Sequence, residues 1–396
     1  MRGVCSGREK RKGVSAMRIV FAAGGTGGHI FPALCVADEL RSRLPDLEAL
    51  FVGTRSGLEA RLVPDAGYDI RYISARGVRG KSAGARIRNG ASIALGFAQS
   101  LGILSRFDPD IVFGSGGYAS AAVVLAASFL RKIVVLQEQN SVPGMTNRLL
   151  ARSAKRMYLG FEKAAEFFKK HPGVIMTGNP LRMEVVAAAR AGSRAEFGLG
   201  SSGPVLFVFG GSQGARTLNR AAAEYLLEHP NVQAIIQTGE QDYQWMKERL
   251  GNASDRVFIA PYIDAMHRAY GASDAALARA GALSVSELAA VGLPSVLVPY
   301  PFAADNHQYY NAELLAGVGG AVIIRDSELN KSSLAAALDP LLMDPERRAA
   351  MKRSLDTVAQ RDAAKTIADD MLTLVSVVVG GQKPSGPTAR MKDSKH

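Results

Sequence analysis

The sequence predicts an α/β protein of two Rossmann-like domains, each built on a doubly wound parallel sheet, that face each other across a cleft. Three observations support this fold class. Apolar runs typical of strands alternate with segments of helical spacing, which is the pattern of parallel sheets. A glycine-rich turn between a strand and a helix occurs twice, at residues 24–28 and 210–214. A chain of 396 residues is also long for one hydrophobic core, so two domains are expected.

The first half begins with an apolar run at residues 18–22, which predicts a strand. Apolar residues then recur at helical spacing over 30–44, which predicts a helix. The same reasoning gives the other elements of this half. Strands are expected at 49–53, 68–74, 110–114, 133–137 and 156–161, and helices at 58–66, 89–106, 119–130 and 143–154.

The alternation breaks at residues 178–182 (GNPLR), which are typical of a linker, and a second set of units opens at 204–209. Further strands are expected at 232–237, 257–261, 275–278, 295–300 and 321–325, followed by one long helical stretch at 345–379. These elements predict a disordered basic extension at 1–16, an N-terminal domain at 17–178 and a C-terminal domain at 179–358. A helix at 359–379 is expected to return to the N-terminal domain, and a disordered tail to follow at 380–396.

The composition restricts the class of protein. The formal net charge is +12, but both ends of the chain are rich in Lys and Arg. This weakens the inference that the positive charge serves to bind nucleic acid. Cys5 and Cys35 are the two cysteines, too few for a disulfide framework, which favours a reducing compartment such as the cytoplasm. The longest apolar run, residues 118–130, is too short to cross a bilayer. The sequence has no cluster of Cys, His or paired Asp that would require a metal.

The two glycine turns are suited to an oxygen-rich or anionic ligand. Glycine lets another molecule approach the backbone closely, and the N–H groups at the start of the following helix point into the turn. The alternative is a tight turn with no ligand. His29 closes the first turn, where packing alone gives no reason for a histidine. Neither turn matches the P-loop pattern or the dinucleotide fingerprint, which disfavours those two classes of site.

Three further features point to a nucleotide and a sugar. Ser212, in the second glycine turn, is placed to donate to a phosphate, or else is a helix N-cap. Glu287 lies one turn into a helix that follows a small-residue turn, where a carboxylate can accept hydrogen bonds from both hydroxyls of a ribose, or else merely suits the helix dipole. In the stretch 299–311, Asp305, Asn306 and Gln308 suit sugar hydroxyls; the alternative is a helix capped by Asp305.

Together these stretches resemble the MurG family, the N-acetylglucosaminyltransferases of bacterial peptidoglycan synthesis, over about residues 17–370. The resemblance rests on an ordered set of motifs. They are residues 24–29 (GGTGGH), 115–118 (SGGY), 138–140 (EQN), 178–180 (GNP) with Arg182, 210–214 (GGSQG), 279–282 (RAGA) through Glu287, and Gln308 with Asn311.

The resemblance implies a glycosyltransferase-B fold and a definite reaction. UDP-N-acetylglucosamine gives its sugar, with inversion, to the 4-hydroxyl of the muramoyl unit of lipid I, and the product is lipid II. No cofactor, metal or nucleic acid is implied. The resemblance places the enzyme on the cytoplasmic face of the cell membrane as a peripheral protein, and proteins of the division and elongation machinery are candidate partners.

The same resemblance assigns roles to residues. It implies that Glu287 binds the ribose and that the backbone of Ile263 binds uracil. The cleft is lined from the first domain by Thr26, Gly27 and Gly28. The diphosphate belongs to Ser212 and the turn Ala282, Leu283, Ser284, Val285 and Ser286, while Gln308, Asn140 and Arg182 reach the donor sugar and its surroundings. One position departs from the pattern: Gln137 stands where a histidine is expected ahead of Glu138, which argues against a required base there.

His29 is the candidate catalytic residue. The acceptor hydroxyl must lose a proton as it attacks, and histidine is the side chain best suited to that role near neutral pH. The rival role is a neutral hydrogen-bonding group that only orients the acceptor. Helix N-termini and an arginine would stabilise the charge that develops on the leaving UDP without a metal.

A basic segment of the first domain is the candidate membrane contact. From Arg71 to Arg106 the sequence contains no acidic residue. Cations near an anionic inner-leaflet surface contribute about 1 kcal/mol each. The residues expected to dock are Arg79, Lys81, Arg86 and Arg88.

Two rival functions remain from the sequence. One keeps the fold and changes the reaction, as in a UDP-N-acetylglucosamine epimerase or a lipid A disaccharide synthase. The other is a basic scaffold that binds nucleic acid or anionic membrane without turnover, against which the clustered glycine-turn motifs count.

Overall fold

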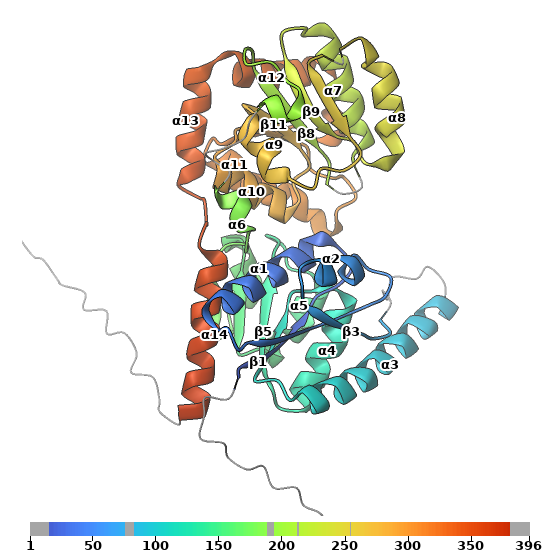
Figure 1. Cartoon of the computed structure of the whole chain (residues 1–396), viewed down its shortest axis with the longest axis vertical. Helices are drawn as coiled ribbons and strands as arrows, with labels where there is room; N and C mark the ends of the chain where they lie inside the picture. The colour runs from blue at the N-terminus through green and yellow to red at the C-terminus, as the bar shows by residue number, and fades with distance from the viewer. Residues whose placement is uncertain (1–15, 76–82, 188–193, 212–213, 254, 381–396) are drawn as a thin grey trace, which may run out of the picture.

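The computed structural model describes residues 16–75, 83–187, 194–211, 214–253 and 255–380, and these form two α/β domains stacked along the long axis of the molecule (Figure 1). Each domain is a parallel sheet with helices on both faces. The predicted fold class is confirmed. The expected extension at 1–16 and tail at 380–396 lie almost entirely outside the described residues.

The first sheet has seven parallel strands in the order β3-β2-β1-β4-β5-β6-β7. Helices α1 and α14 cover one of its faces and α3, α4 and α5 the other, each through buried apolar side chains. The strands are β1 Arg18–Ala22, β2 Glu48–Gly53, β3 Asp69–Tyr72, β4 Ile111–Gly114, β5 Ile133–Glu138, β6 Arg156–Leu159 and β7 Val174–Met176. The helices are α1 Gly27–Arg43, α2 Glu59–Asp65, α3 Ala83–Phe107, α4 Gly117–Phe129 and α5 Met145–Leu150, with 3-10 turns at Ala151–Ser153 and Glu162–Phe168.

The second sheet has six parallel strands in the order β10-β9-β8-β11-β12-β13. Its strands are β8 Val205–Phe209, β9 Gln233–Gln237, β10 Val257–Ala260, β11 Ala275–Ala278, β12 Ser295–Leu297 and β13 Ala321–Ile323. Its helices are α6 Met183–Ala187, α7 Arg216–Glu228, α8 Glu240–Arg249, α9 Met266–Ala272, α10 Ala282–Val291, α11 His307–Gly317, α12 Lys331–Met343 and α13 Pro345–Asp356.

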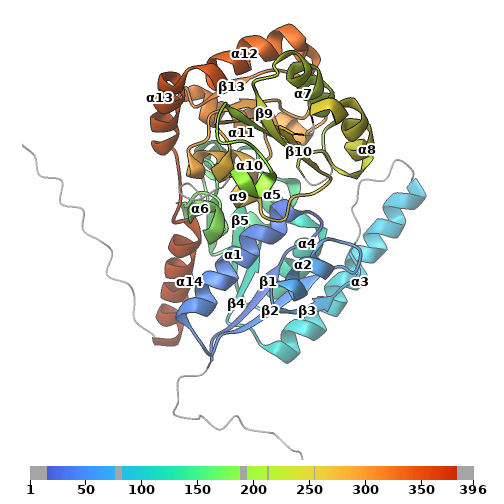
Figure 2. The same ribbon diagram turned by 45° about the horizontal axis from the view of Figure 1, so that its top comes forward.

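The chain ends on the first domain. Helix α14, Ala363–Gly380, runs down the side of the molecule and lies against α1, as both views show (Figures 1 and 2). Its buried residues Ile367, Met371 and Leu374 join the core of the first domain. Asp370 of α14 accepts a hydrogen bond of 2.8 Å from the Tyr158 hydroxyl and pairs with Arg156 at 3.0 Å. The helix expected to return to the first domain is therefore α14.

Three elements differ from the sequence-based expectations. The strand β7 was not predicted. Helix α3 begins at Ala83 rather than at residue 89. The stretch expected as one helix at 345–379 is two helices, because the chain leaves helical geometry after Asp356 as it crosses from one domain to the other.

The strand order decides where a ligand belongs. In doubly wound sheets, ligands bind beyond the carboxyl ends of the strands where the order reverses. That reversal lies between β1 and β4 in the first sheet and between β8 and β11 in the second. The glycine-rich segments that follow these four strands are residues 24–28, 115–117, 210–214 and 279–282. Across the described residues, no helix is both long enough and apolar enough to cross a membrane.

Candidate functional site

The first glycine turn is held by a buried carboxylate that sequence reasoning missed. The Glu59 side chain is fully buried and accepts hydrogen bonds from the backbone N–H of Gly25 at 3.0 Å and of Thr54 at 2.8 Å. The Thr54 hydroxyl also donates to it, at 2.8 Å. A glutamate in the first turn of a short helix gives no warning in sequence that it will anchor a neighbouring loop. Thr26, Gly27 and Gly28 begin α1 directly after this anchored turn.

The glycine turn that follows β4, at residues 115–117, gives His29 its space. Gly116 and Gly117, which follow β4, have φ of +100° and +83°. A Cβ atom on Gly116 would lie 3.0 Å from the His29 ring, and one on Gly117 would lie 2.5 Å from the Gly24 carbonyl oxygen. The Ser115 hydroxyl donates to the His29 carbonyl at 2.7 Å. The two turns therefore pack together, and a side chain at either glycine would collide with the candidate catalytic residue or its loop.

The half-buried His29 side chain is oriented by Gln139, which follows β5. Its Nδ1 lies 3.0 Å from Gln139 Oε1. Gln139 Nε2 in turn donates to the Ser115 carbonyl at 2.8 Å. Sequence reasoning included Gln139 only as part of the EQN motif and did not assign it a role.

The loop after β5 also ties the two domains together. Glu138 is a structural residue, since its carboxylate accepts from the backbone N–H groups of Asn140 and Gly144 and from the Asn147 side chain. The Asn311 side chain of α11 accepts from the Ser141 N–H at 2.9 Å and donates to Asn140 Oδ1 at 3.3 Å. The predicted site residue Asn140 is therefore held at the junction of the domains.

Helix α10 offers backbone N–H groups to a ligand. It follows β11 through Gly281, and its first N–H groups have no partner within the helix. The side chains of Ala282 and Val285 belong to the core of the second domain. The Val285 N–H already donates to the Gly281 carbonyl at 2.9 Å, so of these two residues only Ala282 has a backbone N–H left for a diphosphate. Leu283, Ser284 and Ser286 are half-buried in the same turns of helix. Free N–H groups at a helix N-terminus favour an anion, so the diphosphate contact at this turn stays a prediction.

The buried Glu287 side chain has two polar partners, Tyr270 and Arg182. Its carboxylate accepts from the Tyr270 hydroxyl at 2.8 Å and lies 3.5 Å from the Arg182 guanidinium, which also stacks on the Phe31 ring. Burial raises the pKa of the Glu287 carboxyl, and Arg182 opposes that rise. Burial and the facing carboxylate raise the pKa of Tyr270 well above its ordinary value, so its hydroxyl stays a donor. Arg182, expected near the donor sugar, thus lies beside the residue expected at the ribose.

The second glycine turn and Ile263 are linked by Gln237. Ser212 lies outside the described residues, but Gly214 has φ of +73° and a Cβ atom there would lie 1.9 Å from the Thr238 carbonyl oxygen. Gln237 Nε2 donates to the Gly211 carbonyl at 3.1 Å, and its Oε1 accepts from the Ile263 N–H at 2.9 Å. The backbone N–H of Ile263 is therefore already engaged, which directs the predicted uracil contact to its carbonyl group.

Gln308 lies at the start of α11. Its Oε1 accepts from the Tyr300 N–H at 2.9 Å, which orients its amide N–H₂ group away from Tyr300. Helix α11 begins after Asn306, whose φ of +54° is left-handed and whose side chain makes no capping hydrogen bond. Asp305 instead pairs with Arg148 of the first domain at 3.3 Å. The alternative of a helix capped by Asp305 is not what the structure has. Among the described residues, no group of His, Cys, Asp and Glu side chains is arranged to hold a metal.

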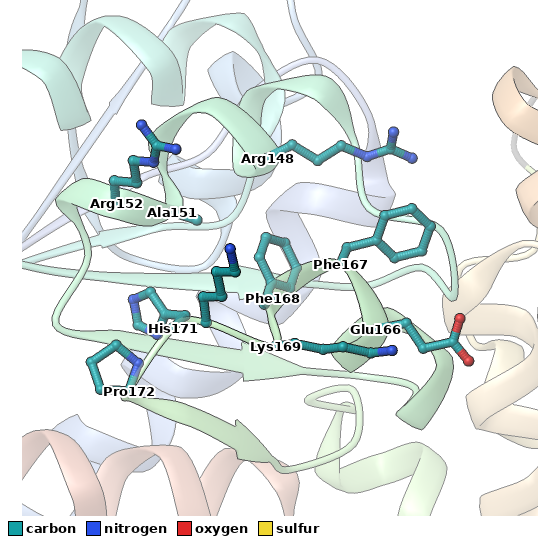
Figure 3. A pocket seen from close by; sticks show the side chains of 10 residues that line it. Arg148, Ala151, Arg152, Glu166, Phe167, Phe168, Lys169, His171 and Pro172 are labelled. Carbon is teal, nitrogen blue, oxygen red and sulfur yellow. The ribbon is translucent and has the colours of Figure 1, made fainter.

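A basic cavity of about 690 Å³ lies away from the glycine turns, beside α5 and the 3-10 turns of the first domain. Figure 3 shows the side chains of Arg148, Arg152 and Lys169 around it, with Phe167 and Phe168. Lys170 also lines the cavity, and Glu166 is its one acidic residue.

Two family models match the chain. The glycosyltransferase family 28 N-terminal domain matches residues 19–159, and the family 28 C-terminal domain matches residues 205–367. A protein of Symbiobacterium thermophilum named UDP-N-acetylglucosamine--N-acetylmuramyl-(pentapeptide) pyrophosphoryl-undecaprenol N-acetylglucosamine transferase is 42% identical over 354 residues, which cover 89% of this chain and 95% of the relative. A protein of the same name from Chlorobaculum tepidum is 42% identical over 365 residues, 90% of this chain and 99% of the relative.

Solved structures agree with these relatives. The crystal structure of Acinetobacter baumannii MurG matches with a TM-score of 0.71 at 28% identity, covering 90% of this chain and 99% of that one. A UDP-N-acetylglucosamine 2-epimerase matches with a TM-score of 0.65 but only 14% identity, covering 94% of this chain and 99% of that one, so that likeness concerns the fold. The chain belongs to the MurG family of glycosyltransferases, the N-acetylglucosaminyltransferases of family 28.

Proposed function

We propose that this chain transfers N-acetylglucosamine from UDP-N-acetylglucosamine to the muramoyl 4-hydroxyl of lipid I, with inversion, and so forms lipid II. One observation carries the proposal. The turn that bears His29 and the helix start that precedes Glu287 follow strands at the reversal points of the two sheets, and side-chain hydrogen bonds join the two domains between them. An acceptor on the first domain and a nucleotide on the second would meet there.

The proposed chemistry is a single displacement. The acceptor oxygen forms a bond to C1 of the sugar, while the bond from C1 to the phosphate oxygen breaks and its electron pair leaves with UDP. His29 takes the proton of the acceptor hydroxyl. The N–H groups that begin α10 stabilise the charge on the leaving diphosphate, because such donors are already oriented before the reaction.

The test is incubation of the purified chain with labelled UDP-N-acetylglucosamine, with and without a lipid I analogue. Label in a lipid II product is the expected result. Conversion of the donor without acceptor would indicate an epimerase instead. Absence of both reactions, with UDP bound normally, would overturn the proposal of a transferase.

We also propose that the first domain docks on the anionic inner leaflet of the membrane, where lipid I would be anchored. The loop predicted to dock lies mostly outside the described residues, so Arg79 and Lys81 stay a prediction from sequence, as do Arg86 and Arg88. The support from the described part is the basic cavity together with apolar side chains on the neighbouring α4 and α5. Phe129, Met145 and Leu149 are 71%, 71% and 72% exposed.

The membrane proposal predicts that Arg152→Glu with Lys170→Glu weakens binding to anionic vesicles by roughly tenfold or more, since each cation near such a surface contributes about 1 kcal/mol. Sedimentation with vesicles containing phosphatidylglycerol measures it. The matched control is Arg220→Glu with Lys247→Glu on α7 and α8 of the second domain, which should leave binding unchanged. Turnover of a water-soluble acceptor should survive in both. Equal loss in both variants would show that net charge, and not this face, decides docking.

A further inference from the structure

A string of buried amide side chains connects His29 to the second domain. Gln137, Gln139 and Asn179 are at most 2% exposed. Gln137 lies in β5, Gln139 directly follows that strand, and Asn179 follows β7, with β6 between the two strands. Gly160, where a Cβ would lie 2.3 Å from the Asn179 amide, leaves room for Asn179. The string continues to Ser286 of α10.

Each amide in this string has a fixed orientation. Gln139 Nε2 faces the Ser115 carbonyl at 2.8 Å, and Asn179 Nδ2 faces the Gln139 carbonyl at 3.0 Å. A carbonyl oxygen only accepts, so in both side chains the nitrogen atom, and not the oxygen, must occupy that place. Gln137 lies between them, with its Oε1 accepting from Gln139 Nε2 and its Nε2 donating to Asn179 Oδ1 at 3.0 Å.

The fixed orientation decides the protonation of the His29 ring. Gln139 presents Oε1, an acceptor, to His29 Nδ1 at 3.0 Å. Nδ1 must therefore carry the hydrogen, which leaves Nε2 as the bare, basic nitrogen of the neutral ring. We propose that Gln139 is a positioning residue that holds His29 in the Nδ1–H tautomer, and that Gln137 and Asn179 hold Gln139 in that orientation. This inference rests on the proposed function, in which Nε2 of His29 takes the acceptor's proton.

The string also reaches the proposed donor site. Asn179 Nδ2 donates to the Ser286 hydroxyl oxygen at 3.0 Å. Because that oxygen accepts from Asn179, the Ser286 hydrogen is directed elsewhere and can donate to an oxygen of the donor. The hydrogen bonds run in one direction, from the His29 ring to Ser286, so the orientation of the base and the start of α10 depend on the same buried amides.

The geometry explains why glutamine serves at position 137, where the resemblance led us to expect histidine. Gln137 uses one acceptor and one donor in the string. A neutral imidazole has the same two functions, one bare nitrogen and one N–H. The side chain at position 137 then serves to fix the orientation of its amide neighbours, and no base is needed there.

The experiment reads the tautomer directly by ¹⁵N NMR of histidine-labelled full-length protein. The chain has six histidines, and the His29→Asn spectrum assigns His29. The parent should show a bare Nε2 and a protonated Nδ1 at His29. Gln139→Met keeps the side-chain length but removes the acceptor, so part of the population should move to the Nε2–H form. The kcat for lipid II formation should fall about tenfold, which is the lower end of the range for metal-binding histidines that lose the hydrogen-bond partner of their other ring nitrogen. The KM for the donor should change by less than about twofold.

Two comparisons separate positioning from general damage. Gln137→His should retain the tautomer and turnover of the parent, whereas Gln137→Met should resemble Gln139→Met. Gln233→Met is the matched control: Gln233 is another buried glutamine whose amide bonds to backbone groups, at Gly200 and Ser202, and its loss should leave His29 unchanged.

A parent His29 protonated on Nε2 would overturn the inference without any variant, and so would an unmoved tautomer in a folded Gln139→Met protein. If Gln139→Met does not fold, the spectrum of the parent and the comparison of Gln137→His with Gln137→Met test the inference instead. The role of His29 as base is tested separately. If Gln139→Met changes the His29 tautomer but His29→Ala keeps full turnover, the positioning role of Gln139 stands and only the proposed chemistry is overturned.

Discussion

His29→Ala should lower the turnover of lipid I by roughly 10²–10⁴-fold, while UDP affinity stays near that of the parent. The size is that expected when a side chain that takes a proton in the transition state is removed. The near-normal affinity follows from the position of His29 on the first domain, whereas the residues predicted to hold the nucleotide lie on the second. Steady-state kinetics with a soluble lipid I analogue and calorimetry with UDP measure the two quantities.

His29→Gln is the sharper variant, because it distinguishes a base from an orienting group. Its side-chain amide reaches the place of Nε2 and can still hydrogen-bond to the acceptor, but it has no basic nitrogen. If His29 is the base, this variant should be as slow as His29→Ala. Recovery of most of the turnover would show that His29 only orients the acceptor, which is the rival role. His171→Ala is a control histidine on the same domain, whose ring bonds to the Ala154 carbonyl and the Gly173 N–H.

The parts of the fold that were predicted from sequence are those with a strong local signal. Buried strands such as β1 and β8 are continuous apolar runs followed by glycine turns, which is the pattern of strands covered on both faces in a parallel sheet. The missed strand β7 has three residues and pairs only with β6, so neither length nor periodicity marks it. The break after Asp356 has no proline or glycine to signal it, because it is imposed by the crossing between domains.

The candidate site divides in the same way. Glycine turns and the helix start at Ala282 carry their geometry in local sequence, so the residues around them were predicted. Glu59 and Gln139 were not assigned roles, because their partners are distant in the sequence: Gly25 lies in the turn after β1 and His29 in the first turn of α1. The role of a buried polar side chain is set by which strand ends the topology brings together, and a single sequence does not contain that information.

Glu287→Ala should weaken UDP binding by at least about tenfold. The proposed contact is a carboxylate that accepts from the two hydroxyls of a ribose, and losing a hydrogen bond to a charged group costs about 1.5–3 kcal/mol. Calorimetric titration with UDP measures the effect. Tyr270→Phe should cause a smaller loss, since it removes only the hydroxyl that orients the carboxylate. Glu240→Ala, an exposed glutamate that begins α8 after a glycine, is the matched control and should bind UDP as the parent does.

The same carboxylate should make the unliganded protein less stable at neutral pH. Burial raises the pKa of Glu287, so the folded chain binds this proton more tightly than the unfolded chain does. The favourable contribution of the protonated form is therefore present below the unfolded pKa and is lost as pH rises through the folded pKa. Glu287→Gln removes the charge and should raise the melting temperature at pH 7 while it lowers the affinity for uridine, a probe without phosphates. An unchanged uridine affinity in a stabilised Glu287→Gln protein would mean that Glu287 is buried for structural reasons and does not hold the ribose.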